Sequence, residues 1–98
     1  MITREQAERL AEQHVETFRA NVPDLMLVSE STIERPFGWV FFYDSRRYVE
    51  TGDPIHAVCD NAPLIVNRHT GELTVTGTAE SIERYIEEYE LSHLGTEI

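Results

Sequence analysis

The five consecutive residues from Trp39 to Tyr43 restrict the fold of this chain more than any other segment. All five favour β-strands. Because side chains alternate across a strand, Trp39, Phe41 and Tyr43 are expected on one face. Val40 and Phe42 then lie on the other face, so both faces are apolar. A strand of this kind is central in a sheet and needs a covering layer on each side.

Two amphipathic helices are predicted to supply those layers. The first begins with a capping box at Thr3 and Gln6 and runs to about residue 21, because Pro23 ends it. The second follows Gly77 and Thr78. The apolar positions that recur at helical spacing are Ala7, Leu10, Ala11, Val15 and Phe18 in the first helix, and Ala79, Ile82, Tyr85, Ile86 and Tyr89 in the second.

Three further strands are predicted, over residues 25–33, 63–66 and 73–76. The last two are joined by a tight turn in which Gly71 supplies a positive φ, and Leu73 and Val75 are expected to face inward. No connection between strands has a helical pattern, which excludes parallel βαβ units. The order α-β-β-β-β-α therefore predicts an α+β fold, with an antiparallel sheet of about four strands and a helix from each terminus packed on it.

The length of 98 residues allows a single domain, residues 1–98, with one modest core. No apolar run approaches the roughly 20 residues that a membrane span needs. The first residues lack the basic and apolar segments of a signal peptide. Cys59 is the one cysteine, so no internal disulfide can form. Together these features predict a cytoplasmic protein.

The net charge narrows the choice of partners. Eighteen acidic residues against eight basic ones give a net charge of −10, and every basic residue is arginine. Binding to a nucleic-acid backbone or to an anionic membrane requires clustered positive charge, so neither is expected. Solubility is the plain interpretation of the acidity. The more specific one is a basic protein partner, because opposite charges accelerate association.

The sequence offers little for catalysis or for metal binding. His56, Cys59 and Asp60 are close in sequence, but a cysteine–histidine pair also needs an orienting group, and packing is the favoured interpretation of a lone cysteine. Structural zinc commonly takes four ligands. The remaining histidines are scattered along the chain: His14, His69 and His93. We therefore predict no catalytic residue, no metal site and no cofactor.

Two segments are candidates for contact with a protein partner. One is the polar stretch from residue 44 to residue 54, predicted as a loop, which carries Arg46, Arg47, Tyr48 and Asp53. The other is the acidic face of the last helix, formed by Glu80, Glu83, Glu87 and Glu88. Composition favours the first segment and charge favours the second. An exposed edge strand would also allow a homodimer.

Two stretches resemble the immunity protein 35 family. They cover residues 34–53, with the run Phe-Gly-Trp-Val-Phe-Phe-Tyr, and residues 61–72, with Asn-Ala-Pro-Leu-Ile-Val, followed by residues 76–79. Asp60 stands where the family pattern has glycine. The resemblance implies that the shared residues determine the fold: Pro36, Gly38, Trp39, Phe41, Tyr43, Asn61, Pro63 and Gly71. Among them, Pro36 and Gly38 are expected to shape a turn. Asn61 is expected to hold its loop through hydrogen bonds from its side chain to the backbone.

The resemblance also implies a function. Members of this family are small bacterial cytoplasmic proteins of polymorphic toxin systems, which bind and neutralise a toxin delivered by sister cells. Some members resemble small heat-stable chaperones instead. With a net charge of −10, the expected partner is a basic toxin domain, for which a nuclease is the natural candidate, because a nuclease must itself attract phosphate. A chaperone that shields unfolded clients is the alternative.

Overall fold

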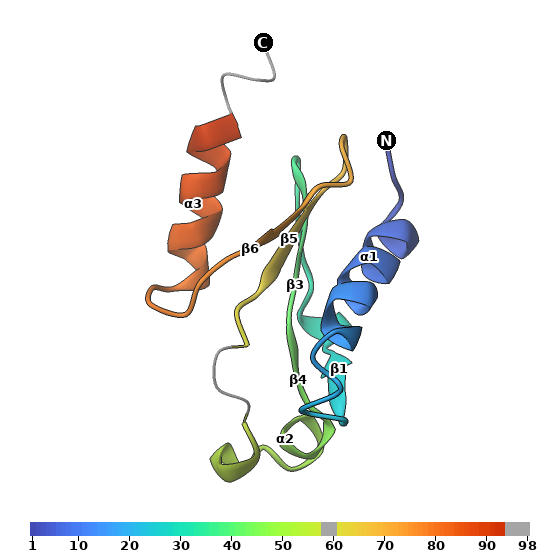
Figure 1. Ribbon diagram of the computed structural model, residues 1–98. Coiled ribbons are helices and arrows are strands. Elements are labelled where there is room, and N and C mark those ends of the chain that lie inside the picture. The colour runs from blue at the N-terminus through green and yellow to red at the C-terminus, as the bar shows by residue number, and fades with distance from the viewer. Residues whose placement is uncertain (58–60, 94–98) are drawn as a thin grey trace.

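The computed structural model describes residues 1–57 and 61–93 and shows helices at both ends with short strands between them (Figure 1). The elements are α1 (Arg4–Glu16), β1 (Leu25–Leu27), the 3-10 turn η1 (Ser29–Ser31), β2 (Ile33–Arg35), β3 (Gly38–Phe41), β4 (Tyr43–Ser45), α2 (Arg46–Thr51), the 3-10 turn η2 (Pro54–His56), β5 (Leu64–Asn67), β6 (Leu73–Val75) and α3 (Ile82–His93). The predicted α+β class is confirmed.

The strands form two antiparallel sheets. The larger has the order β2-β3-β5-β6, and the smaller pairs β1 with β4. Strand β3 is central, as its apolar residues predict, and Trp39 is opposite Val66 in β5. Residues 25–35 and 38–45 are the two arms of one long hairpin, whose pairing is interrupted by η1 on one arm and by Phe42 on the other.

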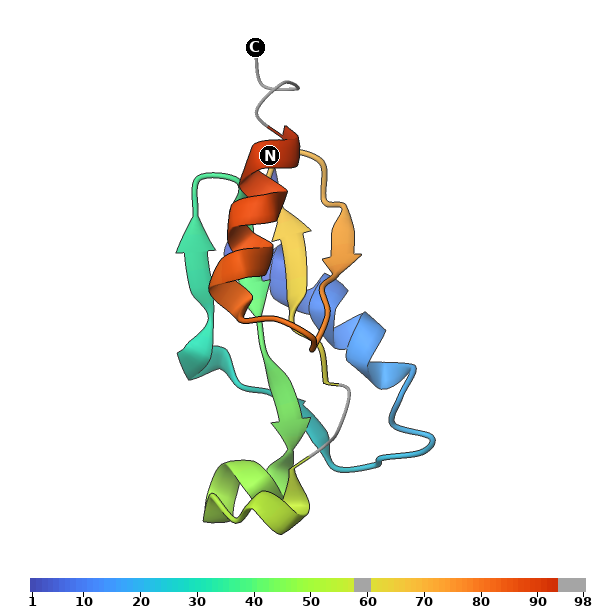
Figure 2. The ribbon, with the colours of Figure 1, turned by 90° about the vertical axis from the view of Figure 1, so that its left-hand side faces the viewer.

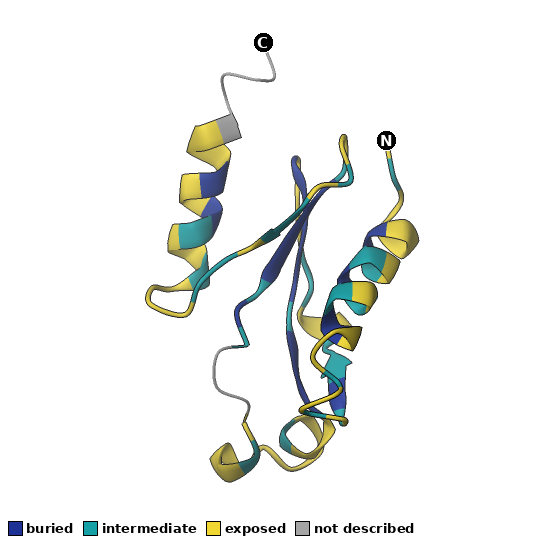
Figure 3. Ribbon diagram, viewed as in Figure 1, coloured by how far each residue is buried: buried dark blue, intermediate teal, exposed yellow. Residues whose placement is uncertain are grey.

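The two faces of β3 contribute to two separate cores, as the alternation predicts. Helix α1 covers one face and α3 covers the other (Figures 1 and 3). The first core joins Ala7, Ala11, Val15 and Leu25 to the odd-numbered positions, Trp39, Phe41 and Tyr43, with Leu64 and Val66 of β5. The second core consists of Phe37, Val40, Ile65, Ile86 and Tyr89. Each core is small, and β3 and β5 belong to both.

The apolar run divides at Phe42, which the sequence does not reveal. Up to Phe41 the strand pairs with β2 and β5, whereas from Tyr43 onward it pairs with β1. At the break the Phe42 carbonyl accepts a hydrogen bond from the Val28 N–H (2.8 Å). The strand predicted over residues 25–33 is likewise wrong as a single element, because η1 separates β1 from β2.

The first helix ends earlier than predicted, and the last helix begins later. The capping box at Thr3 and Gln6 is present, but α1 ends at Glu16 rather than near residue 21. Four hydrogen bonds between residues 17 and 21 reach back only three residues, including the one from the Phe18 N–H to the Val15 carbonyl (2.9 Å), and they tighten the chain into turns. Phe18 is consequently exposed. Helix α3 begins at Ile82, so Ala79 precedes it and is also exposed.

Two turns depend on residues that the sequence singled out. Gly71 has a φ of 76°, as predicted, and the Asn67 side chain closes the same turn by accepting hydrogen bonds from the backbone N–H groups of His69 and Thr70. Val75, however, does not face inward as expected. It lies at the end of β6, an edge strand, and is 49% exposed.

Gly38 holds the other turn, after Pro36 and Phe37. Its φ is 148°, a conformation that other residues rarely adopt. A Cβ added at this position would lie 2.0 Å from the carbonyl oxygen of Val66, which is rigid backbone of β5. Glycine is therefore required both for its backbone conformation and for the close approach of β3 to β5.

We expect Gly38→Ala to lower the free energy of unfolding by about 2–5 kcal/mol, combining backbone strain with the steric clash. Gly52→Ala is the matched control, because Gly52 also has a positive φ (70°) but has no neighbouring atom within 4 Å of an added Cβ. Its loss is expected to be about 1–2 kcal/mol. Urea denaturation measures both variants, and equal losses would show that the close approach is unimportant.

Burial raises the pKa of the Tyr43 hydroxyl above its usual value. An unfolded tyrosine ionises near pH 10, whereas folded Tyr43 stays protonated there. Tyr43 therefore supports folding below about pH 10, and this contribution is lost as the pH rises further. We expect the stability of Tyr43→Phe, measured by urea denaturation between about pH 9 and pH 11, to fall less steeply than that of the native chain. Parallel slopes would contradict this assignment.

Candidate functional site

The segment predicted as a loop after Asp44 is instead a short helix, α2, followed by η2. Ser45 begins the helix by accepting a hydrogen bond at Oγ from the Tyr48 N–H (3.1 Å), and it donates to the His56 carbonyl (2.6 Å). Gly52, with its left-handed φ, ends it. Sequence reasoning missed this helix because its six residues lack an apolar periodicity, although the cap residues at both ends were available as signals.

Four residues proposed for binding on this segment have different environments. Arg46 and Arg47 are exposed, whereas Tyr48 is half-buried. Asp53 has a local role, because its Oδ1 accepts a hydrogen bond from the Ile55 N–H (3.1 Å) and caps η2. The tip of the segment also presents Ile55, which is 80% exposed and was not singled out from the sequence.

A pocket of about 700 Å³ lies beside α2 and brings together three parts of the chain. Its walls come from η1 and the residue before it, from the β3–β4 junction, and from α2 and the residues after it. The lining residues are Val28, Glu30, Ser31, Phe42, Tyr43, Asp44, Tyr48, Val49, Gly52 and Asn61. Of the predicted binding residues, only Tyr48 contributes to this pocket.

Asp44 is the buried acid of this pocket, with 8% of its surface exposed. Its Oδ1 accepts a hydrogen bond from the Ser45 N–H (2.7 Å), and its Oδ2 accepts one from the Asn61 side-chain amide (3.0 Å). The same amide donates to the Tyr43 carbonyl (2.9 Å), so Asn61 holds the start of its loop as the family resemblance implied. Sequence reasoning overlooked Asp44, although alternation from Val40 through Phe42 would have placed it on the same face as these two residues.

The acidic face of α3 contains two kinds of carboxylate. Arg84 forms ion pairs with Glu80 (3.4 Å) and Glu88 (3.1 Å), so these two charges are partly neutralised. Glu83 and Glu87 are exposed and, among the residues that the structure describes, have no basic partner; Glu90, one turn further along, shares this property. The four residues predicted as one group therefore divide into a neutralised pair and a pair that keeps its charge.

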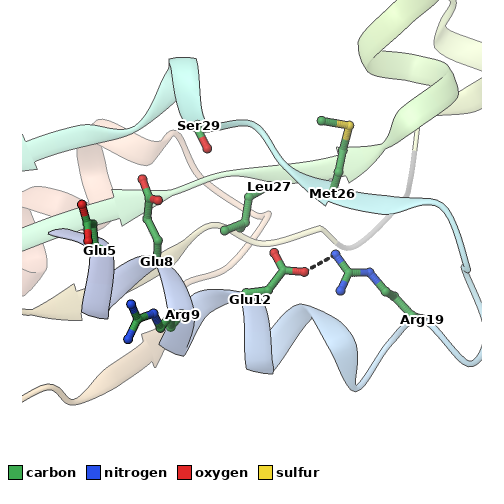
Figure 4. Close-up of a pocket in the computed structure, with 8 residues that line it drawn as sticks. All are labelled: Glu5, Glu8, Arg9, Glu12, Arg19, Met26, Leu27 and Ser29. Carbon is green, nitrogen blue, oxygen red and sulfur yellow. Dashed lines mark ion pairs between the residues drawn. The ribbon is translucent and has the colours of Figure 1, made fainter.

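A third surface, not predicted from the sequence, is a groove of about 510 Å³ between α1 and the segment from β1 to η1 (Figure 4). Arg19 forms ion pairs there with Glu12 and Glu16, and the hydrogen bond that it donates to the Glu16 carboxylate raises the pKa of the Arg19 guanidinium. Arg4 pairs with Glu8. These charges neutralise one another within α1, so the groove offers less net charge to a partner than α3 does.

The residues considered for catalysis or for metal binding do not form a site in the described part of the chain. Cys59 and Asp60 lie outside the described residues. Within residues 1–57 and 61–93, no three histidine, cysteine or acidic side chains are placed to hold a metal ion. His14 packs edge-on against Phe18, and His69 is exposed in its turn. None of the described helices is both long and apolar enough to cross a membrane.

The unneutralised acids of α3 and the aromatic pocket are surface features of the kind that protein-binding domains carry. The chain is a member of the immunity protein 35 family, whose profile matches residues 5–90. The resemblance drawn from the sequence is thus confirmed. The members of this family are described as immunity proteins.

The chain is also similar to a protein of Escherichia coli (strain K12), described as uncharacterized protein YrhB. The two are 39% identical over 54 residues, which is 55% of this chain and 57% of the relative. The chain therefore matches little more than half the length of that curated relative. No solved structure is significantly similar to this chain.

We expect Asn61→Ala to lower the free energy of unfolding by about 1–3 kcal/mol, because it removes two hydrogen bonds around the buried Asp44. Asn21→Ala, at an exposed position in a turn, is the control and should change stability by less than about 0.5 kcal/mol. Thermal unfolding of the two variants makes the comparison. An Asn61→Ala variant as stable as the control would show that Asn61 does not hold the loop.

Proposed function

We propose that this chain is a non-enzymatic, cytoplasmic immunity protein that binds a basic, nuclease-like toxin and covers its active site or substrate groove. Membership of the immunity protein 35 family supports toxin neutralisation. The observation that supports a basic toxin is the outer face of α3, where Glu83, Glu87 and Glu90 are exposed with no ion pair among the described residues. Their spacing of four and three residues places them along one side of the helix.

Electrostatics explains why such a surface suits immunity. A toxin must be captured before it acts, so a high association rate matters as much as affinity. Oppositely charged surfaces raise association rates by about 10- to 1000-fold at low salt. A nuclease presents positive charge around its substrate groove because it binds phosphates. An acidic helix directed at that groove would both accelerate capture and exclude the nucleic acid.

The distribution of charge favours α3 over the two other surfaces. Much of the negative charge of α1 is neutralised by Arg4 within the helix and by Arg19 just after it. Helix α2 carries Arg46 and Arg47, which a basic partner would repel. Figure 2 shows α3 and α2 at opposite ends of the molecule, so a first contact on α3 lies away from the two arginines. We therefore place the first contact on α3.

The test starts with capture of the partner from a lysate of the native host at low salt. We expect one dominant partner with a toxic activity, such as nuclease activity, that this chain suppresses at equimolar amounts. The triple variant Glu83→Gln/Glu87→Gln/Glu90→Gln should lower the association rate constant about tenfold at low salt and have little effect at high salt. Surface plasmon resonance with the purified partner measures both conditions.

The matched control is Glu5→Gln/Glu50→Gln/Glu72→Gln, which removes the same number of charges from exposed positions elsewhere. It should retain most of the association rate. An affinity that does not change with salt, or equal effects of the two triple variants, would contradict the assignment to α3. Capture of many unrelated proteins, with no activity to suppress, would support the chaperone function instead.

A further inference from the structure

The pocket beside α2 lies on the same face of the chain as α3 but is not covered by it. Val40, Phe42 and Asp44 alternate toward this face. Val40 packs in the core beneath α3, and Phe42 lies at the edge of that core. Asp44 lines the pocket, and no residue of α3 does. In Figure 2 this part of the face lies below α3, between η1 and α2. A partner that first contacts α3 and then extends along this face reaches the pocket.

The lining combines negative charge with aromatic surface. Asp44 and Glu30 are its two acids, and the described lining residues include no base. Asp44 is held in one orientation by the Ser45 N–H and the Asn61 amide, so its charge is preorganised rather than free to rotate toward water. Glu30, on η1, is exposed and adds a second charge at the opposite wall.

The aromatic and apolar parts of the lining match the remainder of a long cationic side chain. Phe42 and Tyr48 provide rings, and a cation over such a ring is attracted by its negative face. Val28 and Val49 provide apolar surface of the kind that covers the methylene groups of arginine or lysine. The guanidinium group suits this combination better than an ammonium group, because it is planar, stacks on rings and makes paired hydrogen bonds with a carboxylate.

We propose that this pocket is a socket for an arginine side chain of the toxin, which anchors the complex after α3 has attracted it. The proposal rests on the proposed function in that it takes the partner to be a basic protein. It assigns different tasks to two surfaces: the exposed glutamates of α3 act at long range on association, and the pocket acts at short range on dissociation.

The socket can be tested without the toxin. N-acetyl-arginine amide is titrated into the 15N-labelled chain and followed by NMR. We expect shifts concentrated at the backbone amides of Ser31, Tyr48, Val49, Gly52 and Asn61. N-acetyl-lysine amide should bind more weakly, and N-acetyl-citrulline amide, which has nearly the same shape but no charge, should not bind. Equal binding of citrulline, or arginine-induced shifts spread over α1 and α3 with none at the pocket, would overturn the proposal.

Three variants refine this result. Asp44→Asn should weaken binding of the arginine probe about tenfold. Because Asp44 is buried and its loss can disturb folding, Glu30→Gln and Tyr48→Leu provide independent tests, each with about a threefold loss expected. Glu72→Gln, which removes one exposed charge from the turn between β5 and β6, is the control and should leave probe binding unchanged. Retention of full affinity by both Glu30→Gln and Tyr48→Leu would overturn the proposal.

The same variants separate failure of the socket from failure of the proposed function. With the captured toxin, Tyr48→Leu should raise the dissociation rate constant about threefold while the association rate stays constant. If the toxin is captured and suppressed but neither the probe binds nor Tyr48→Leu changes dissociation, the socket is wrong and the immunity function stands. If the probe binds as expected but no toxic activity is suppressed, the socket stands and the proposed function is wrong.

Discussion

The close pairing of β3 with β5 is the interaction on which the rest of the structure depends. Both strands are buried on both faces, so each contributes to the core under α1 and to the core under α3. Gly38 permits that pairing by bringing its backbone against Val66. In a chain of 98 residues neither core is large. A loss of register between the two strands would expose apolar side chains on both faces at once.

The two helices pack on this centre in different ways, and the difference bears on function. Helix α1 presents Ala7 and Ala11 to the sheet, and small side chains allow its backbone to lie close. Helix α3 contacts the sheet through the longer side chains of Ile86 and Tyr89. The acids of α1 are neutralised largely by arginines within or just after the helix, whereas α3 has only Arg84 for the same purpose. The helix with unneutralised charge is thus the one farther from the sheet, and it is the surface that we propose a partner contacts first.

The division of the long hairpin at Phe42 creates the pocket beside α2. Because the chain changes pairing partners there, β4 leaves the main sheet and carries Asp44 and Ser45 away from the cover of α3. Ser45 then starts α2, and Asn61 returns to fasten Asp44 and the Tyr43 backbone. Asn61 and Tyr43 on this path therefore organise a pocket as well as a core.

The sequence by itself determined the α+β class, the central strand, the alternation that separates the two cores, the capping box of α1 and the turn at Gly71. Each of these features follows from the local spacing of apolar residues or from the conformational preference of a single residue, and both can be read from the sequence. Only the tertiary structure decided where the strands divide, that residues 46–51 are helical, and which acids keep their charge. Each outcome depends on a particular partner. The strands divide where the Val28 N–H bonds to the Phe42 carbonyl, and the start of α2 is held by contacts with His56 and Asn61. The charges of Glu80 and Glu88 are neutralised because Arg84 lies between them. A local sequence pattern cannot specify such partners. Alternative folds of this chain can have the same helix and strand propensities and differ only in which backbone groups and charges come into contact.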